Sequence, residues 1–452
     1  MRKSLLSILI ALMASNCVMA QSEVSERESI KQEIKNEVLE ELKAEVKTTD
    51  DNKLKFKPYG FIRNYFCYDT RECVAVMGET FYMIPQDVRL NEDLSEDLNA
   101  VNRVTLAAFT TRFGVDIAGP NIGKATSSAK IEADFSGFGS NNTLFRVRQA
   151  FVKLAWEDVA LTVGQTWHPM VIQLLPTTIG FSPGAPFAQF NRSPQVNVNV
   201  NMGKGWSLLA AAMYQHPNTS VGPMGATHDY ARWNLWPELC TSIKHSGENF
   251  LFGASVDYLT LKPRQTSVAN RSVVAEDGTT SIESVTVRVN DRVSGLSAEM
   301  FAEYKSGLFN LKGEVFYGEN TAHLTMISGF GATAYDEQTG SYEYAPLRSI
   351  TSWLNATYGK RVIVGLFGGF SQNLGAKKDF ISTNDFWAKG AKNTDYLYRV
   401  SPSLTYTIKS LALALEADYT VVGYGDVAIN GHSKALRDVG AWRVCAMVKY
   451  SF

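Results

Sequence analysis

The chain ends on the stretch AWRVCAMVKYSF, residues 441–452, in which apolar side chains recur at every second position. The recurring set is Trp442, Val444, Ala446, Val448, Tyr450 and Phe452, and the intervening set is Arg443, Cys445, Met447, Lys449 and Ser451. Successive side chains of a β-strand point to opposite faces. The stretch therefore predicts a strand with one wholly apolar face that ends in an aromatic residue.

The same two-residue period runs through most of the chain from about Phe56 onward. In residues 394–407, Tyr396, Tyr398, Val400, Leu404 and Tyr406 alternate with Asp395, Arg399, Ser401, Ser403 and Thr405. Residues 411–421 repeat the pattern after a tight turn at Lys409. We count about sixteen such runs, which predicts an all-β protein built of antiparallel hairpins.

Long and short connections alternate between these runs. The long connections are residues 69–101, 168–193, 216–231, 263–290, 319–345, 372–393 and 425–437, with one shorter exception at 139–143. Transmembrane β-barrels of the outer-membrane type have short turns at one end and long loops at the other. The predicted fold is an all-β transmembrane barrel of about 16 antiparallel strands over residues 56–452, preceded by a short N-terminal α-helical coiled coil. The last strand should close the barrel against the first, with Tyr450 and Phe452 in the aromatic girdle.

The composition excludes several other classes of protein. Of the 452 residues, 20% are charged and 11% are aromatic. Beyond the N-terminus, no run approaches the ~18 apolar residues that a transmembrane helix needs. The formal net charge of −1 gives no overall field that would attract nucleic acid.

The N-terminus has the layout of an export signal. Arg2 and Lys3 precede an apolar run from Leu5 to Met13, and small residues lead to Ala20. We interpret residues 1–20 as a secretory signal peptide; a lipoprotein cut before Cys17 is the alternative.

Residues 21–49 are rich in Glu and Lys and contain a helical stripe of Ile30, Ile34, Val38, Leu42 and Val46. This stripe predicts a periplasmic coiled-coil helix, and a solvated linker remains the alternative. Residues 50–55 form a linker to the barrel.

Cysteine and histidine are sparse. Cys67, Cys73, Cys240 and Cys445 are too few for a disulfide scaffold. Cys67 and Cys73 are close enough in sequence to bridge one loop, and two unpaired thiols are the alternative. The six histidines lack the spacing of metal ligands, so neither a metal site nor a cofactor is predicted.

Several motifs of the first two hundred residues resemble those of a known family. They are YGFIRNYFCYDTRE (59–72), FTTRFGVDIAGP (109–120), AKIEADFSGFG (129–139), LFRVRQAFVKL (144–154), GQTWHPM (164–170) and NRSPQV (191–196). In this order they resemble the DcaP-like trimeric outer-membrane porins, which carry an N-terminal periplasmic coiled coil before a sixteen-strand barrel. The resemblance implies a homotrimer in the bacterial outer membrane. The Cys67/Cys73 pair and the long first loop depart from the family pattern.

The polar sets of the strands are expected to line the lumen. The predicted channel-lining residues are Arg63, Arg112, Lys130, Glu132, Asp134, Arg146, Arg148, Arg192, Arg399, Glu416 and Asp418. A bulge near Gln149 should shift the phase of the fourth strand. Arg112, Arg146 and Arg148 come from neighbouring strands, and an Arg fork suits carboxylate or phosphate.

The third long connection is unusually apolar for a loop, since it contains MVIQLLPTTIGFSPGAPFAQF (170–190). Folding into the lumen as a constriction would bury it, and packing over the rim or at a subunit contact are alternatives. The predicted constriction residues are His168, Gln173, Phe181, Phe187 and Phe190. The segment GFSPG (180–184) matches the hydrolase motif G-x-S-x-G, but it lacks the strand-to-helix turn, and Pro183 removes the N–H that an oxyanion hole needs.

These features predict a porin and no enzyme. Small hydrophilic solutes, anionic or zwitterionic, would diffuse through it, with outer-membrane lipids and two further subunits as partners. A structural or adhesive barrel with a plugged lumen is the alternative, and a barrel hydrolase is the weakest interpretation.

Overall fold

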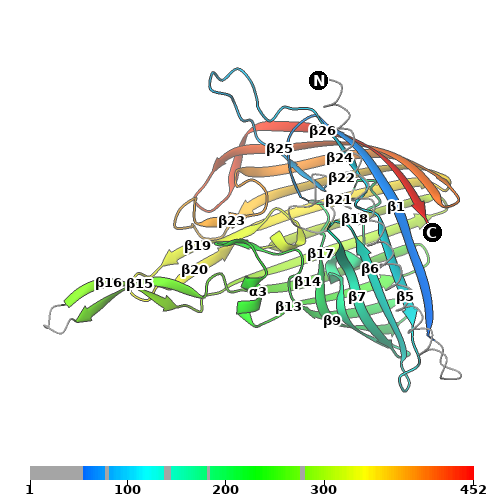
Figure 1. Cartoon of the computed structure of the whole chain (residues 1–452), viewed down its shortest axis with the longest axis horizontal. Helices are drawn as coiled ribbons and strands as arrows, with labels where there is room; N and C mark the ends of the chain where they lie inside the picture. Colours follow the sequence, from blue (N-terminus) through cyan, green and yellow to red (C-terminus); the bar gives the residue numbers. More distant parts are fainter. Residues whose placement is uncertain (1–53, 77–80, 137–143, 181–183, 275–279) are drawn as a thin grey trace, which may run out of the picture. The chain divides into compact units, whose positions relative to one another are not determined.

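The computed structural model describes residues 54–76, 81–136, 144–180, 184–274 and 280–452. The predicted signal peptide, the predicted coiled coil and most of the linker lie outside these ranges, as does Phe181. Residues 56–117 and 122–452 form one compact unit, which contains the barrel (Figure 1).

The described chain forms a closed antiparallel sheet of sixteen wall positions, one of which consists of two segments, β4 and β5. In chain order the wall strands are β1 (Lys55–Asp69), β4 (Arg103–Ala107) with β5 (Arg112–Ala118), β6 (Thr126–Asp134), β7 (Arg146–Ala155), β8 (Val159–Trp167), β9 (Arg192–Gly203), β10 (Trp206–Met213), β13 (Glu238–Ser246), β14 (Phe250–Leu261), β17 (Val293–Ser306), β18 (Phe309–Glu319), β21 (Arg348–Gly359), β22 (Val362–Gly375), β24 (Thr394–Ile408), β25 (Leu411–Val427) and β26 (Ser433–Ser451). Each strand pairs with its neighbours in sequence, which confirms the predicted barrel.

The long connections contain secondary structure that the sequence did not predict. Their elements are β2 (Cys73–Val76), β3 (Phe81–Pro85), α2 (Pro169–Ile172), β11 (Val221–Gly222), β12 (Gly225–Ala226), α3 (Asp229–Asn234), β15 (Thr266–Val274), β16 (Thr280–Arg288), η1 (Ala322–Leu324), β19 (Gly329–Tyr335), β20 (Tyr342–Pro346) and β23 (Phe386–Ala388). The β15–β16 hairpin projects away from the wall in Figure 1. The last predicted loop, 425–437, is shorter than expected because β25 and β26 continue into it.

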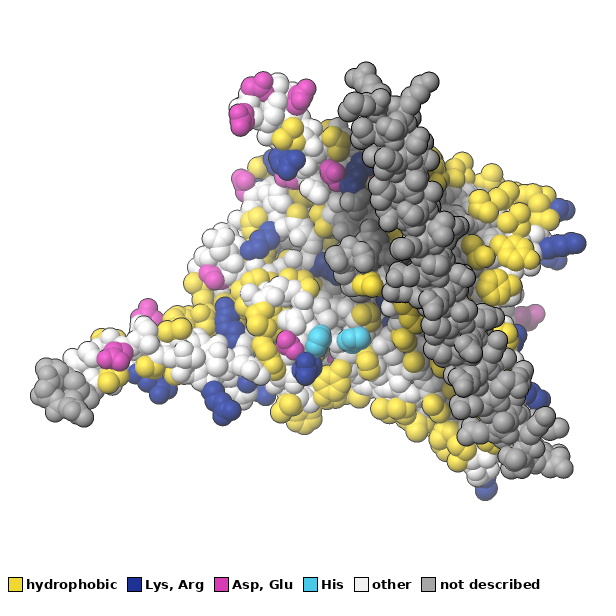
Figure 2. Space-filling view, in the orientation of Figure 1, with side chains coloured by type: hydrophobic (Ala, Val, Ile, Leu, Met, Phe, Trp, Pro, Cys, Tyr) yellow, Lys and Arg dark blue, Asp and Glu magenta, His cyan; other side chains and the backbone are white. Residues whose placement is uncertain are grey.

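The two faces of each strand differ in polarity as predicted. On β26, Trp442 and Tyr450 are exposed outward, whereas Arg443 and Cys445 are buried inward. Figure 2 shows hydrophobic side chains at the lower edge of the view, where Figure 1 places β9 and β13. The helices in the described part of the chain are all too short or too polar to serve as a transmembrane segment.

The first and last strands close the barrel. β26 pairs with β1 in a continuous register from Phe61↔Ser451 to Asp69↔Arg443. Two backbone hydrogen bonds continue the seam, from Gly60 N–H to the Phe452 carbonyl (3.1 Å) and from Phe452 N–H to the Gly60 carbonyl (3.0 Å). No backbone edge of this seam is therefore left to face lipid unpaired.

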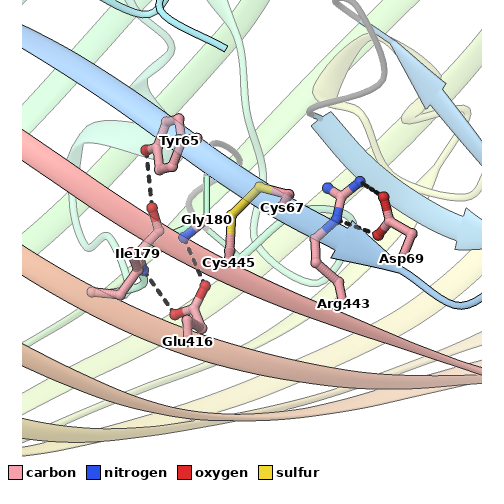
Figure 3. The surroundings of a disulfide bond; sticks show 8 residues. All are labelled: Tyr65, Cys67, Asp69, Ile179, Gly180, Glu416, Arg443 and Cys445. Carbon is pink, nitrogen blue, oxygen red and sulfur yellow. Dashed lines mark hydrogen bonds and ion pairs between the residues drawn. A yellow bond between two sulfur atoms is a disulfide. The ribbon is translucent and has the colours of Figure 1, made fainter. Parts of the chain in front are cut away.

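A disulfide and an ion pair link the side chains across the seam (Figure 3). The register places Cys67 directly opposite Cys445, and the two form a disulfide. Both predictions for Cys67, a bridge to Cys73 or an unpaired thiol, are therefore wrong. Two positions along the same strands, Arg443 donates to both carboxylate oxygens of Asp69 at 2.6 and 2.9 Å.

Replacing both Cys67 and Cys445 with serine is expected to lower the free energy of unfolding by about 2–4 kcal/mol, because a disulfide restricts the unfolded chain. The measurement is a urea titration of the detergent-solubilised protein, followed by its heat-sensitive mobility on gels. A reductant should destabilise the wild type and leave the double variant unchanged. Identical unfolding midpoints for oxidised and reduced wild type would contradict the prediction.

Candidate pore lining

Charged side chains from β6 and β7 form a buried network on the inner wall. Asp134 accepts hydrogen bonds from Arg146 (2.8 Å to Nη2) and Arg148 (2.8 Å to Nη1), and Glu132 accepts one from Arg148 Nε at 2.8 Å. All four side chains are less than a tenth exposed. The contacts are charge-assisted and close to ideal in length, so the two carboxylates compensate the two arginines.

A β-bulge makes this network possible. Glu132 pairs with Gln149 and Ala133 with Val147, so one extra residue of β7 stands opposite β6. The insertion turns Arg148 and Gln149 to the same inner side, which confirms the predicted bulge.

The cations nearer the barrel seam are less compensated. Arg112 lies 3.7 Å from Glu132, and Arg63 donates to the hydroxyl of Thr110 at 3.0 Å. Arg63 also lies over the rings of Phe61 and Tyr65, 4.9 and 5.0 Å from their centroids. Within the described chain, Arg63 has no carboxylate within ion-pair distance.

The other two cations predicted to line the early part of the wall, Lys130 and Arg192, have different surroundings. Lys130 pairs with Asp116 at 2.9 Å, so its charge is balanced. Arg192 is buried, with its guanidinium 4.6 Å from the centroid of Trp167 and 5.1 Å from that of Phe190. Arg192 therefore packs as a flat cation against two aromatic rings at the base of the third loop.

The third long connection is hydrogen-bonded to the inner wall at its midpoint (Figure 3). Glu416 of β25 accepts the backbone N–H of Ile179 at 2.7 Å and that of Gly180 at 2.6 Å. The hydroxyl of Tyr65 of β1 donates to the Ile179 carbonyl at 2.9 Å. The midpoint of the loop is thus bonded to β25 and β1, the two strands that flank the last strand, β26.

Contacts with four further wall strands hold the rest of this loop. Lys312 donates to the Leu175 carbonyl (2.9 Å), Asn355 accepts from Thr177 N–H (2.7 Å), Arg399 donates to the Ala185 carbonyl (3.1 Å), and Gln189 donates to Glu299 (3.0 Å). Phe187 is fully buried, and its ring centroid lies 6.2 Å from that of Phe367 on β22. These partners face inward, so this segment lies against the inner face of the barrel.

The predicted residues therefore separate into groups with different roles. Arg399 and Glu416 bind the loop backbone, and Asp418 is buried beside Arg443 in the strand register. Gln173, Phe187 and Phe190 are buried within the loop itself. In the motif GFSPG, residues 181–183 lie outside the described residues.

One buried cluster was missed. His168 lies beside Glu238, Asp257 and His323. His168 directly follows β8, Glu238 and Asp257 lie on β13 and β14, and His323 lies in the connection between β18 and β21. Because these four positions are far apart in sequence, no local spacing could have indicated them.

A closed barrel with an apolar exterior, a charged lining and a loop on its inner wall defines the class of outer-membrane channels. Residues 23–209 match the family described as DcaP outer membrane protein, which confirms the predicted resemblance over this part. No curated protein matches the chain.

Solved structures of this class share the fold. The outer membrane channel DcaP of Acinetobacter baumannii aligns with a TM-score of 0.61 and 18% identity, over 88% of this chain and 97% of that one. An anion-selective porin from Comamonas acidovorans aligns with a TM-score of 0.54 and 10% identity, over 88% of this chain and 100% of that one.

Replacing Glu416 with alanine should release the midpoint of the third loop. Each hydrogen bond to a charged group contributes about 1.5–3 kcal/mol, so amide exchange at Ile179 and Gly180 should accelerate by about 100-fold. Hydrogen exchange followed by mass spectrometry measures the effect. The control is Glu157→Ala in an exposed turn, where exchange should not change; equal rates in the two variants would show that Glu416 does not anchor the loop.

Proposed function

We propose that the protein is an outer-membrane porin for passive diffusion of small hydrophilic solutes, with a preference for anionic or zwitterionic ones. The observation that carries the preference is the charge count on the early wall. This part of the wall carries four arginines and two carboxylates, namely Arg63, Arg112, Arg146 and Arg148 with Glu132 and Asp134. The excess is two positive charges on one side of the lumen.

The opposite wall has no comparable cluster of cations among its described residues. Glu299 and Glu314 are buried on β17 and β18, and Glu303 is paired with Lys305 at 3.0 Å. Excess positive charge on the early wall raises the local concentration of anions. A solute carboxylate would exchange water for the N–H donors of Arg63 and Arg112.

The third loop would act as the constriction. Its backbone is fixed at Leu175, Ile179 and Ala185 by side chains of the inner wall. A loop fixed in this way would reduce the free cross-section of the lumen from β17 round to β1, where Tyr65 holds Ile179 two residues from Arg63.

A plugged barrel with a structural or adhesive role is the second candidate, because the same loop builds an apolar cluster inside the barrel with Phe187, Phe190, Trp353 and Phe367. Single-channel recording separates the two functions. A porin gives stepwise ohmic currents, whereas a plugged barrel gives none.

We further propose a homotrimer. Phe113, Phe135 and Phe145 form an exposed aromatic cluster on the outer face, with centroids of Phe113 and Phe145 5.6 Å apart. Trp156 is a second exposed aromatic residue, at the other end of β7. An exposed aromatic cluster such as that of the three phenylalanines favours contacts between subunits.

The charge preference predicts the effect of removing the less compensated cations. Arg63→Gln with Arg112→Gln should shift the reversal potential in a salt gradient toward cation selectivity. The shift should shrink in 1 M salt, where the Debye length is about 3 Å. The matched control is Arg146→Gln with Asp134→Asn, which removes one charge of each sign and should leave the reversal potential near the wild-type value.

An unchanged permeability ratio in the Arg63/Arg112 variant would contradict the proposed selectivity. A shift of equal size in the charge-neutral control would show that wall structure, and not net charge, sets the ratio.

The proposed trimer predicts a heat-sensitive complex of three subunits after mild detergent extraction. Deleting residues 21–49 should weaken this complex and leave the barrel folded, since the predicted coiled coil contributes association only. Light scattering measures the mass, and a monodisperse full-length monomer would contradict the prediction.

A further inference from the structure

Two histidines and two carboxylates meet in a buried cluster at the loop end of the barrel. His168 caps α2, Glu238 begins β13, Asp257 lies on β14, and His323 belongs to η1. Each residue offers one ligating atom, and these four atoms all lie within 4.8 Å of one another. Glu238 Oε1 is 2.9 Å from His168 Nε2 and 2.8 Å from His323 Nε2, and Asp257 Oδ1 is 3.7 Å from His168 Nε2.

The charge of this cluster is unbalanced. The side chains of Glu238 and Asp257 are each 1% exposed, and their ion-pair partners in the described chain are the two histidines alone. The atoms Glu238 Oε2 and Asp257 Oδ1 accept no hydrogen bond from the described residues. A buried carboxylate without a full set of donors is unfavourable. With both carboxylates ionised and both histidines neutral, the site would have a formal charge of −2.

We propose that His168, Glu238, Asp257 and His323 bind one divalent transition-metal ion, with zinc the best match. Zinc takes four ligands in a tetrahedron at about 2.0–2.2 Å, which sets neighbouring ligand atoms about 3.4 Å apart. The two shortest distances between ligand atoms are 2.8 and 2.9 Å, and all four atoms lie within 4.8 Å of one another. The ideal separation falls within this range. Two imidazoles select zinc over magnesium and calcium, which prefer oxygen ligands.

The hydrogen bonds of the site define what metal binding would change. His168 Nδ1 accepts the Met170 N–H at 3.2 Å, so the neutral ring carries its proton on Nε2 and donates it to Glu238. A metal at Nε2 would shift this proton to Nδ1 and break the Met170 contact, because a protonated nitrogen cannot accept a hydrogen bond. His323 Nδ1 makes no hydrogen bond within the described chain, so the same shift there breaks none. Two carboxylates and one divalent ion then give a neutral site.

The metal would join three parts of the barrel. His168 begins the third loop, Glu238 and Asp257 belong to the wall, and His323 lies in the connection between β18 and β21. One ion therefore cross-links two loops to two wall strands. This inference does not depend on the proposed solute preference.

The test is zinc binding to the full-length protein in detergent after removal of metals with a chelator. Calorimetry should give one saturable zinc site per chain, with no comparable binding of magnesium or calcium. Cobalt should give the visible absorption bands of a tetrahedral ion. Folding is checked independently by the heat-sensitive mobility of the barrel.

Replacing His168 and His323 together with alanine should raise the zinc dissociation constant at least about tenfold and abolish the cobalt spectrum. The control is His432→Ala, a histidine of the last loop outside the cluster, which should bind as the wild type. If the double variant does not fold, Glu238→Gln with Asp257→Asn keeps the shape of both side chains and should lose zinc equally. The proposal is overturned if the wild type shows no saturable binding, or if a folded ligand variant binds with wild-type affinity.

Discussion

The structure depends on the pairing of β26 with β1. Hydrocarbon offers no hydrogen-bond partner, so every backbone N–H and C=O of a membrane-spanning sheet must be paired within the protein. The register from Phe61↔Ser451 to Asp69↔Arg443 meets this requirement with backbone bonds. The Cys67–Cys445 disulfide and the Arg443–Asp69 ion pair then fix the same register through side chains. The rest of the wall follows from pairing between sequential neighbours.

Closure also dictates how the interior is organised. A barrel of this size encloses more space than the wall side chains fill, and its inner face is polar. The early wall uses paired charges, as in the Arg146–Asp134 contact, whereas the later wall binds the third loop through Glu416 and Arg399. The loop can be apolar because its aromatic side chains pack on Phe367 and Trp353. Paired charges and a bound loop are thus two different ways in which the inner face of the wall satisfies its polar groups.

The features that could be predicted from the sequence are those that local pattern determines. The two-residue period alone assigns Trp442 to the outer face of the barrel and Arg443 to the inner face. In the same way, the change of period after Arg148 indicates the bulge in β7. Pairing between distant residues leaves no such local trace. The partner of Cys67 is set by the register of the seam, and the sequence offered the nearer Cys73 instead.

The same limit applies to charge and to the loops. Arg146 and Arg148 could be assigned to the inner wall, but the sequence did not reveal that Asp134 and Glu132 compensate them. The histidine cluster draws one residue from each of four elements and so has no motif. Strands such as β19 and β20 are short and are stabilised by tertiary contacts, which period counting does not capture.

The disulfide also makes the order of synthesis matter. The two cysteines are separated by 378 residues, and a ribosome makes Cys67 long before Cys445. In an oxidising compartment, Cys67 meets Cys73 and Cys240 as earlier candidates for a bond. The native bond can form only once Cys445 has been made, and only if Cys67 has not already been oxidised by one of these earlier partners. Its presence in a preparation therefore shows that Cys67 escaped or exchanged the bonds open to it earlier in synthesis.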